Sequence, residues 1–176
     1  MIGRFFEVYN QHIKSFESQS GFTRNQIVIL ASIVEKETGA PEERPMIASV
    51  FLNRLKKKMR LQSDPTTIYG LLPRYSGNLT KANLLESTPY NTYAIGGLPA
   101  GPISNPGLAA LRSVVEPAQT EYLYFVSKNE GTHFFSRTYE EHNKAVHNFQ
   151  QMRNNRVGKS WRDLHKNRPS NLQKGN

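Results

Sequence analysis

The segment from Thr23 to Pro41 constrains this chain most, because it combines a helix start, an apolar helix face and a helix stop. Thr23 and Gln26 have the spacing of a capping box, in which each side chain binds the backbone N–H of the other residue. Gly39 and Pro41 are residues that end helices. The segment therefore predicts a helix that ends near Thr38 and buries one face against the rest of the chain.

Two glutamates lie at the end of this helix, and they differ in the direction they face. At about 100° per residue, Glu37 falls inside the apolar arc and Glu35 falls near its edge. The arc consists of Ile27, Leu30, Ala31, Ile33 and Val34. Apolar surroundings and a helix C-terminus both disfavour an ionised carboxylate, so we expect a raised pKa for Glu37, as a general acid requires. The alternative is a solvated helix end over residues 35–37.

The composition limits the size and chemistry of the chain. With 176 residues, 37% hydrophobic and 21% charged, it can bury one core. We expect one catalytic domain over residues 1–152, with a helical lead-in over 1–20, and a basic, disordered tail over 153–176. The absence of cysteine excludes disulfides, thiol nucleophiles and thiolate metal sites.

The net charge of +9, with a pI near 9.9, predicts attraction to polyanions such as nucleic acid, anionic lipid or an acidic cell-wall polymer. Residues 56–60 and the tail carry much of the excess, although both can also be read as solvated surface. No run of about 18 apolar residues occurs, and residues 1–4 do not form the apolar core of a signal peptide. A targeting segment, if the protein needs one, is expected to be missing from this chain.

The remaining periodicity predicts an α+β fold, mostly helical in a single domain with a small antiparallel hairpin. In the helix over 42–59, Arg54 is expected at the outer edge of the apolar stripe, and Asp64 before Pro65 is expected to cap the next helix. The hairpin is expected from residues 121–126 and 132–136. Further helices are expected over 4–18, 80–85, 105–116 and 138–152, the fourth of these opened by a capping box at Thr138.

Residues 88–107 read as a long loop without regular periodicity, rich in proline and glycine. A loop of this length is unusual as a mere connection. Its aromatic and amide side chains suit sugar recognition, because rings stack on sugar faces and amides bind hydroxyl and acetamido groups. The alternative is a proline-stiffened loop that packs only for stability.

Several kinds of chemistry have no matching pattern. The five histidines lack ligand spacing, so we expect no metal, and no phosphate-binding loop, dinucleotide motif or nucleophile elbow occurs. Acid/base chemistry by carboxylate remains. A glycoside hydrolase normally uses two carboxylates, for which Asp64 is the obvious second beside Glu37. A lytic transglycosylase needs only one, since the sugar supplies its own nucleophile.

Six motifs, in order, resemble the catalytic domain of the MltG (YceG-like) endolytic murein transglycosylases. They are Ala31–Thr38, Ala48–Leu55, Met59–Thr66, Tyr90–Tyr93, Gly97–Ile103 and Tyr122–Val126. The resemblance implies cleavage of the MurNAc-β-1,4-GlcNAc bond inside nascent peptidoglycan strands, leaving a 1,6-anhydroMurNAc end. It places the essential acid at Glu37, followed by the hydroxyl residue Thr38, with Glu35 as the alternative or as a supporting charge.

The resemblance also implies a setting for the protein. It implies no cofactor, peptidoglycan glycan strands and peptidoglycan synthases as partners, no nucleic acid, and action at the periplasmic or extracytoplasmic face of the bacterial inner membrane. Family members usually carry a transmembrane helix and a LysM-like region, so we expect this chain to be part of a longer one that holds the anchor. The glycan-binding candidates are Gln62, Ser63, Asp64, Asn91, Thr92, Tyr93 and Asn105.

Two other functions stay open from the residues. One is a muramidase-type hydrolase that uses Glu37 and Asp64. The other is a non-catalytic basic module that binds cell wall or nucleic acid through its charge.

Overall fold

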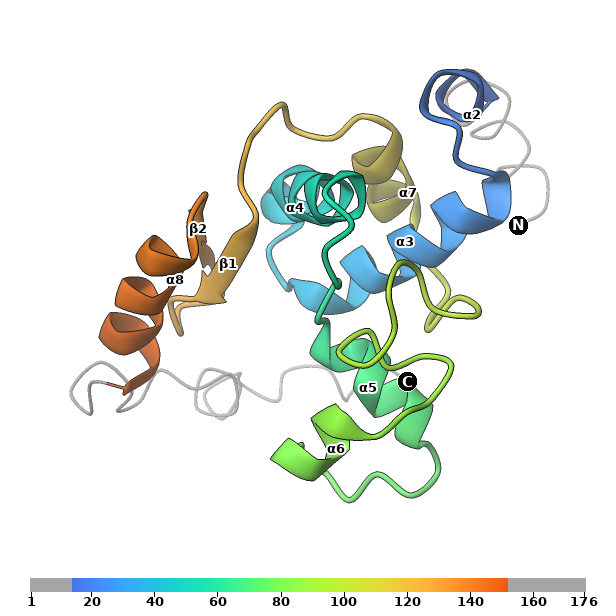
Figure 1. Ribbon diagram of the computed structural model, residues 1–176. Coiled ribbons are helices and arrows are strands. Elements are labelled where there is room, and N and C mark those ends of the chain that lie inside the picture. Colours follow the sequence, from blue (N-terminus) through green and yellow to red (C-terminus); the bar gives the residue numbers. More distant parts are fainter. Residues whose placement is uncertain (1–13, 152–176) are drawn as a thin grey trace, which may run out of the picture. The chain divides into compact units, whose positions relative to one another are not determined.

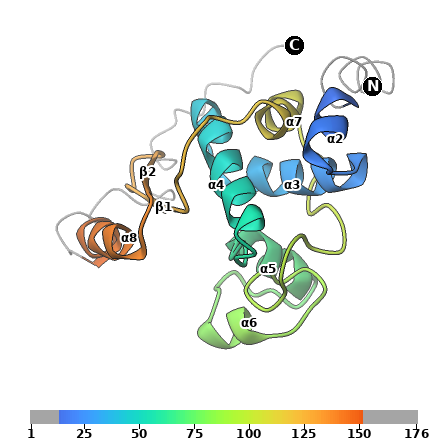
Figure 2. The same ribbon diagram turned by 45° about the horizontal axis from the view of Figure 1, so that its top comes forward.

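A computed structural model describes residues 14–151 (Figures 1 and 2). The chain divides into two compact units after Leu123. The predicted α+β class, mostly helical with one antiparallel hairpin, is confirmed. The predicted domain limits stay a prediction. Most of the expected helix over 4–18 lies outside the described residues, and the basic tail over 153–176 lies wholly outside them.

The first unit is helical in its described part. Its helices are α2 (Lys14–Ser20), α3 (Arg24–Glu37), the short 3-10 helix η2 (Pro41–Glu43), α4 (Arg44–Lys56), α5 (Asp64–Leu71), α6 (Lys81–Leu85) and α7 (Leu108–Val115). Helix α3 contacts α4, α7 and α5, and α4 also contacts α7 (Figure 2). No helix among residues 14–151 is long and apolar enough to cross a membrane.

The core of this unit forms where α3, α4 and α7 meet. The side chains buried there include Ile27, Leu30, Ile33, Val34, Ile47, Val50, Phe51, Ala110 and Val114. Burying one large aliphatic side chain contributes about 1.5–3 kcal/mol, so this cluster fixes α3 firmly against its neighbours. The capping box of Thr23 and Gln26 is present as predicted, and α3 ends at Glu37.

Helix α4 differs from its prediction in two respects. It ends at Lys56, because Lys58 adopts a positive φ of 55° and turns the chain. Arg54, expected at an outer edge, is only 7% exposed, so that prediction is wrong. Its guanidinium donates to the backbone carbonyls of Leu61 (2.7 Å) and Leu123 (2.6 Å), which satisfies the buried charge.

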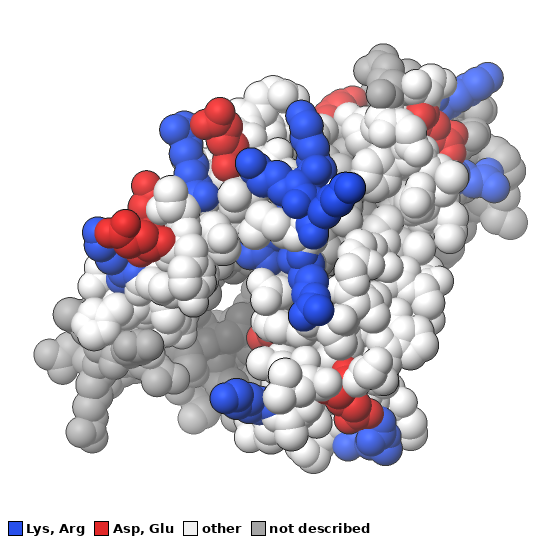
Figure 3. All heavy atoms as spheres, in the orientation of Figure 1, with Lys and Arg blue, Asp and Glu red and all other residues white. Residues whose placement is uncertain are grey.

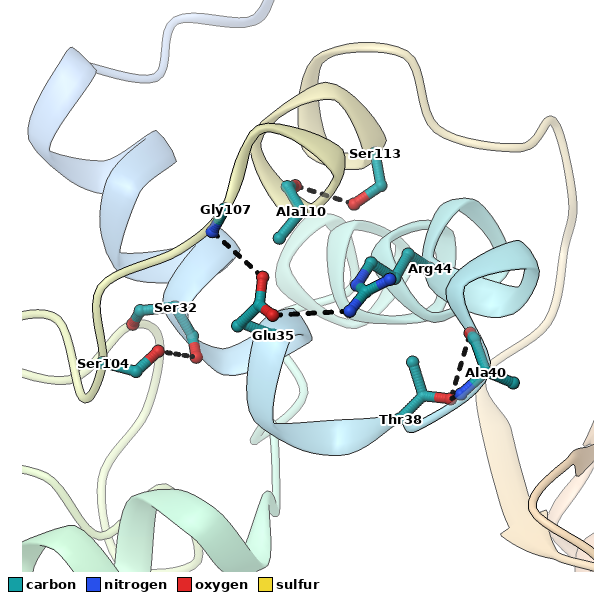
Figure 4. Close-up of polar contacts among 9 residues, drawn as sticks. All are labelled: Ser32, Glu35, Thr38, Ala40, Arg44, Ser104, Gly107, Ala110 and Ser113. Carbon is teal, nitrogen blue, oxygen red and sulfur yellow. Dashed lines mark hydrogen bonds and ion pairs between the residues drawn. The ribbon is translucent and has the colours of Figure 1, made fainter. Parts of the chain in front are cut away.

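The long loop over residues 88–107 contains no helix or strand, as predicted. It is tied to the middle of α3 through Ser32, whose hydroxyl accepts from the Ile103 backbone N–H at 2.9 Å. The Ser104 hydroxyl donates to the Ser32 carbonyl at 3.0 Å (Figure 4). Helix α7 then begins at Leu108, later than expected, with Gly107 as its N-cap.

The second unit contains the hairpin and the end of the described chain. Strands β1 (Tyr124–Ser127) and β2 (His133–Ser136) pair antiparallel, with Tyr124 opposite Ser136. The predicted capping box of Thr138 opens α8 (Tyr139–Val146), which contacts both strands. The chain then continues as a π-helical segment, η3 (His147–Gln151).

Basic side chains gather on one face of the first unit (Figure 3). They lie over α4 and the chain that leaves it, a segment that contains Lys56, Lys57, Lys58 and Arg60. The Arg60 guanidinium donates to the Tyr93 carbonyl at 3.0 Å, so this basic segment reaches the long loop.

Candidate active site

The last turn of α3 carries Glu35 and Glu37, whose carboxylates have different partners. Glu37 accepts a short hydrogen bond from the hydroxyl of Ser63, which precedes α5. Glu35 instead contacts Arg44 at the start of α4 and the backbone of Gly107 before α7. Because the two side chains point in different directions from the helix, they contact different neighbours.

Burial of the Glu37 carboxyl favours its protonated form. The residue keeps partial exposure to solvent, but burial of the carboxyl raises its pKa from 4.5 to about 7. The hydrogen bond from Ser63 lowers the pKa, the charge of Asp64 raises it and Arg54 lowers it, all by less than burial does. The predicted direction of the shift is confirmed, and burial is its main cause.

The backbone of Ser63 is held by two threonine hydroxyls. Its own N–H donates to Thr92 Oγ1 at 2.9 Å, and its carbonyl accepts from Thr66 Oγ1 at 2.6 Å. Gln62 before it has a φ of 52°, which turns the chain sharply into α5. Ser63 is 2% exposed and its hydroxyl donates to the Glu37 carboxylate, while its contact with glycan stays a prediction.

Asp64 does not cap α5, contrary to prediction. Ser63 is the N-cap, and Asp64 is the first residue of the helix, with Pro65 next. The Asp64 carboxylate accepts a hydrogen bond from the Tyr93 hydroxyl at 2.7 Å instead. Burial and this hydrogen bond raise the pKa of the Tyr93 phenol, which therefore stays a donor. Asp64 and Tyr93 thus form a polar pair beside Glu37.

The side chains of Asn91 and Thr92 are bonded within the protein, and their role as glycan ligands stays a prediction. Asn91 is 1% exposed, its amide donates to the carbonyls of Glu86 (2.6 Å) and Leu84 (3.0 Å), and its oxygen accepts from Thr67 (2.8 Å). Thr92 is fully buried and bonds Ser63 as described. Their polar groups hold the long loop against α5 and α6.

The other two binding candidates are exposed. The side chain of Gln62 is exposed beside Ser63, while its backbone N–H donates to the Thr92 carbonyl at 3.2 Å. Asn105 is exposed in the loop just before α7. Their contact with glycan stays a prediction.

Glu35 joins three helices (Figure 4). Its carboxylate lies 3.4 Å from the Arg44 guanidinium and accepts from the Gly107 N–H at 3.0 Å, at the N-terminus of α7. The charges that shift the Glu37 pKa are those of Asp64 and Arg54, so the expected support from Glu35 is not found. Its alternative role as the acid stays a prediction. Thr38, after Glu37, binds the Ala40 N–H at 2.9 Å and shapes the turn that follows α3.

Arg54 is the residue near the site that the sequence did not single out. It influences the pKa of both Glu37 and Tyr93, although its hydrogen bonds go to backbone carbonyls. Its position two residues before the end of α4 resembles an ordinary surface arginine. Residues 14–151 contain no group of three acidic or histidine side chains that could hold a metal ion.

Comparison with known proteins identifies the family of this chain. Residues 1–148 match the YceG-like family. The chain belongs to this family. A crystal structure of a yceG-like protein from Listeria monocytogenes is similar to it, with a TM-score of 0.68 and 41% identity, over 75% of this chain and 42% of that one.

Two curated relatives of this YceG-like chain carry the name endolytic murein transglycosylase. The protein of Bacillus subtilis (strain 168) is 38% identical over 139 residues, which is 77% of this chain and 38% of the relative. The protein of Streptococcus pneumoniae (strain ATCC BAA-255 / R6) is 34% identical over 145 residues, or 79% and 25%. The YceG-like chain therefore spans well under half the length of each.

Proposed function

We propose that this chain is the catalytic part of an endolytic murein transglycosylase, with Glu37 as its single acid and base. The observation that carries the proposal is a carboxyl with a pKa of about 7, buried beside Ser63 in a protein of the YceG-like family. The names of the Bacillus and Streptococcus relatives support murein as the substrate. The bond is the MurNAc-β-1,4-GlcNAc linkage within nascent strands.

In the first step, protonated Glu37 donates its proton to the glycosidic oxygen as the bond to C1 of MurNAc breaks. The GlcNAc hydroxyl leaves with that proton, and the sugar left behind has oxocarbenium character. Glu37 becomes ionised, and the Ser63 hydroxyl, whose hydrogen bond favours the charged form, stabilises it at this moment.

In the second step, the C6 hydroxyl of the same MurNAc attacks C1. Its proton passes to ionised Glu37, which restores the acid for the next cycle. The product is a 1,6-anhydroMurNAc end, no water enters the balance, and no metal or cofactor is required. A pKa near neutrality suits a group that must donate and then accept the same proton.

Because the polar pair of Asp64 and Tyr93 lies beside Glu37, we assign it to the side of the sugar where positive charge develops. A carboxylate there stabilises the oxocarbenium centre, and its charge also raises the Glu37 pKa. Tyr93, Gln62 and Asn105 are the proposed glycan contacts, with Tyr93 held by its hydrogen bond to Asp64. Tyr93→Ala should weaken binding of glycan fragments with little change in melting temperature, as fluorescence titration and thermal melts would show; an equal loss of both favours a packing role.

The position of Asp64 supports a second candidate function, that of a muramidase-type hydrolase. Asp64 lies close enough to Glu37 to raise its pKa, and a carboxylate pair can support hydrolysis. The two candidates differ in their product. Mass spectrometry of purified uncrosslinked strands after digestion should find anhydro ends, which are lighter by one water than the reducing ends of a hydrolase. Reducing ends alone would replace the transglycosylase by the muramidase.

The proposed substrate implies a place of action. Nascent glycan is made outside the cytoplasmic membrane, so we propose the extracytoplasmic face of the inner membrane, with peptidoglycan synthases as partners. The basic face over α4 would favour an acidic wall polymer.

A further inference from the structure

A cavity of about 450 Å³ opens beside the proposed active site, in the first unit. Its lining residues are Lys36, Pro65, Ile68, Tyr69, Leu72 and Ile103. Lys36 directly precedes Glu37, and Pro65 directly follows Asp64. The two segments that carry the carboxylates of the site, α3 and the start of α5, therefore also contribute residues to the lining of this cavity.

One face of α5 supplies most of the lining. The helical spacing of Pro65, Ile68 and Tyr69 places their side chains on one side of α5, and Leu72 is the C-cap residue that follows. Leu72 is 58% exposed and Tyr69 is 37% exposed, although Tyr69 packs its ring against Tyr90 at 4.7 Å. Large apolar side chains left open in a concave surface are typical of a binding site.

The lining is suited to an apolar ligand with a negative charge. Apart from Lys36 and the Tyr69 hydroxyl, the described side chains around the cavity offer no hydrogen bonds. A sugar ring placed there would leave several hydroxyls unpaired, which is unfavourable. Lys36 is exposed, and no carboxylate among residues 14–151 pairs with it. Its ammonium is free to bind an anion.

We propose that this cavity binds the peptide stem attached to the MurNAc residue at the cleavage site. The stem begins at the lactyl ether on C3 of that sugar, and its first part carries methyl groups and a carboxylate. The methyl groups match Ile68, Leu72 and Ile103, and the carboxylate matches Lys36. The inference rests on the proposed function, because it takes murein as the substrate.

Paired substrates test the proposal. The wild-type protein is given uncrosslinked strands with intact stems, and the same strands after an amidase has removed the stems. We expect kcat/KM to be about tenfold higher with stems, from buried methyl groups and one exposed ion pair. Equal values on the two substrates would overturn the inference and leave the proposed function standing. Failure on both substrates would contradict the proposed function, and the binding measurement below then decides the inference.

Substitutions identify the residues responsible. Lys36→Met keeps the aliphatic part and removes the charge, so the ratio of the two kcat/KM values should fall about threefold, whereas Lys36→Arg should retain it. Lys81→Met removes an exposed charge outside both the cavity and the basic face, and it is the matched control. Leu72→Ala should lower the ratio two- to threefold, and Leu85→Ala, at a leucine 73% exposed elsewhere, should not. Equal effects of a variant and its control would overturn the assignment.

A binding measurement avoids catalysis altogether. The probe is a synthetic lactyl tripeptide with free carboxylates, added to methyl-labelled protein and followed by NMR. We expect the methyl signals of Ile68, Leu72 and Ile103 to shift at millimolar peptide, and those of Leu85 to stay in place. Lys36→Met should weaken the response. Unchanged cavity methyl signals in the wild type would overturn the proposal.

Discussion

The last turn of α3 carries two glutamates, Glu35 and Glu37, in different surroundings. Glu37 has lost water and gained one hydroxyl donor, and its pKa rises to about 7. Glu35 contacts the guanidinium of Arg44 and accepts a hydrogen bond from the backbone N–H of Gly107 before α7. The comparison shows that the neighbours, and not the residue type, decide whether a glutamate is buried with a raised pKa or held in an ion pair between helices.

The largest expected effect comes from Glu37→Gln. The amide keeps the shape and can still accept the Ser63 hydrogen bond, but it cannot donate a proton as an acid. Turnover should fall by about 10²–10⁴-fold, measured by release of anhydro-ended fragments. Circular dichroism should show an unchanged fold. A variant with wild-type turnover would remove Glu37 from the mechanism.

Glu35→Gln is the same substitution at the other glutamate, and we expect it to lower stability more than activity. The amide loses its charge opposite Arg44 and at the start of α7, so the free energy of unfolding at pH 7 should fall by about 1 kcal/mol. Turnover should remain measurable. If this variant alone were inactive, with Glu37→Gln still active, the roles of the two glutamates would have to be exchanged.

Ser63→Ala should produce a smaller effect, visible in the pH profile. For the wild type, kcat/KM should fall on the alkaline side with an apparent pKa near 7, because the acid must be protonated. The Ser63 hydrogen bond lowers that pKa, so its removal should move the alkaline limb to higher pH. Initial rates across pH 5–9 would measure this, with Ser87→Ala as a control outside the site. An unmoved limb would mean that Ser63 does not act on the acid.

Local patterns predicted the parts of the molecule that depend on neighbours in sequence. Helix α3, its capping box and the direction of Glu37 follow from residues 23–41 alone, and the hairpin follows from two short apolar runs. The absence of regular structure in the long loop was equally evident from its proline and glycine content.

Distant partners decided what the sequence did not predict. Arg54 is buried because carbonyls from residues 61 and 123 surround it, which no helical pattern reveals. Asp64 is the first residue of α5 and not its cap, and its carboxylate binds Tyr93, which lies 29 residues further on. Asn91 is a residue type that often binds sugars, but its side-chain amide donates to backbone carbonyls of α6 and of the chain after it.

The central claim is that burial keeps Glu37 protonated, and stability against pH tests it most directly. Because the folded pKa of about 7 exceeds the unfolded value of 4.5, protonated Glu37 contributes stability below pH 4.5, and this is lost as pH rises through 7. The difference corresponds to up to about 3 kcal/mol. Glu37→Gln, neutral throughout, should match wild type in acid and become more stable by about that amount at pH 8. Chemical denaturation of both proteins from pH 4 to 8 would measure the gap; parallel curves would contradict the account.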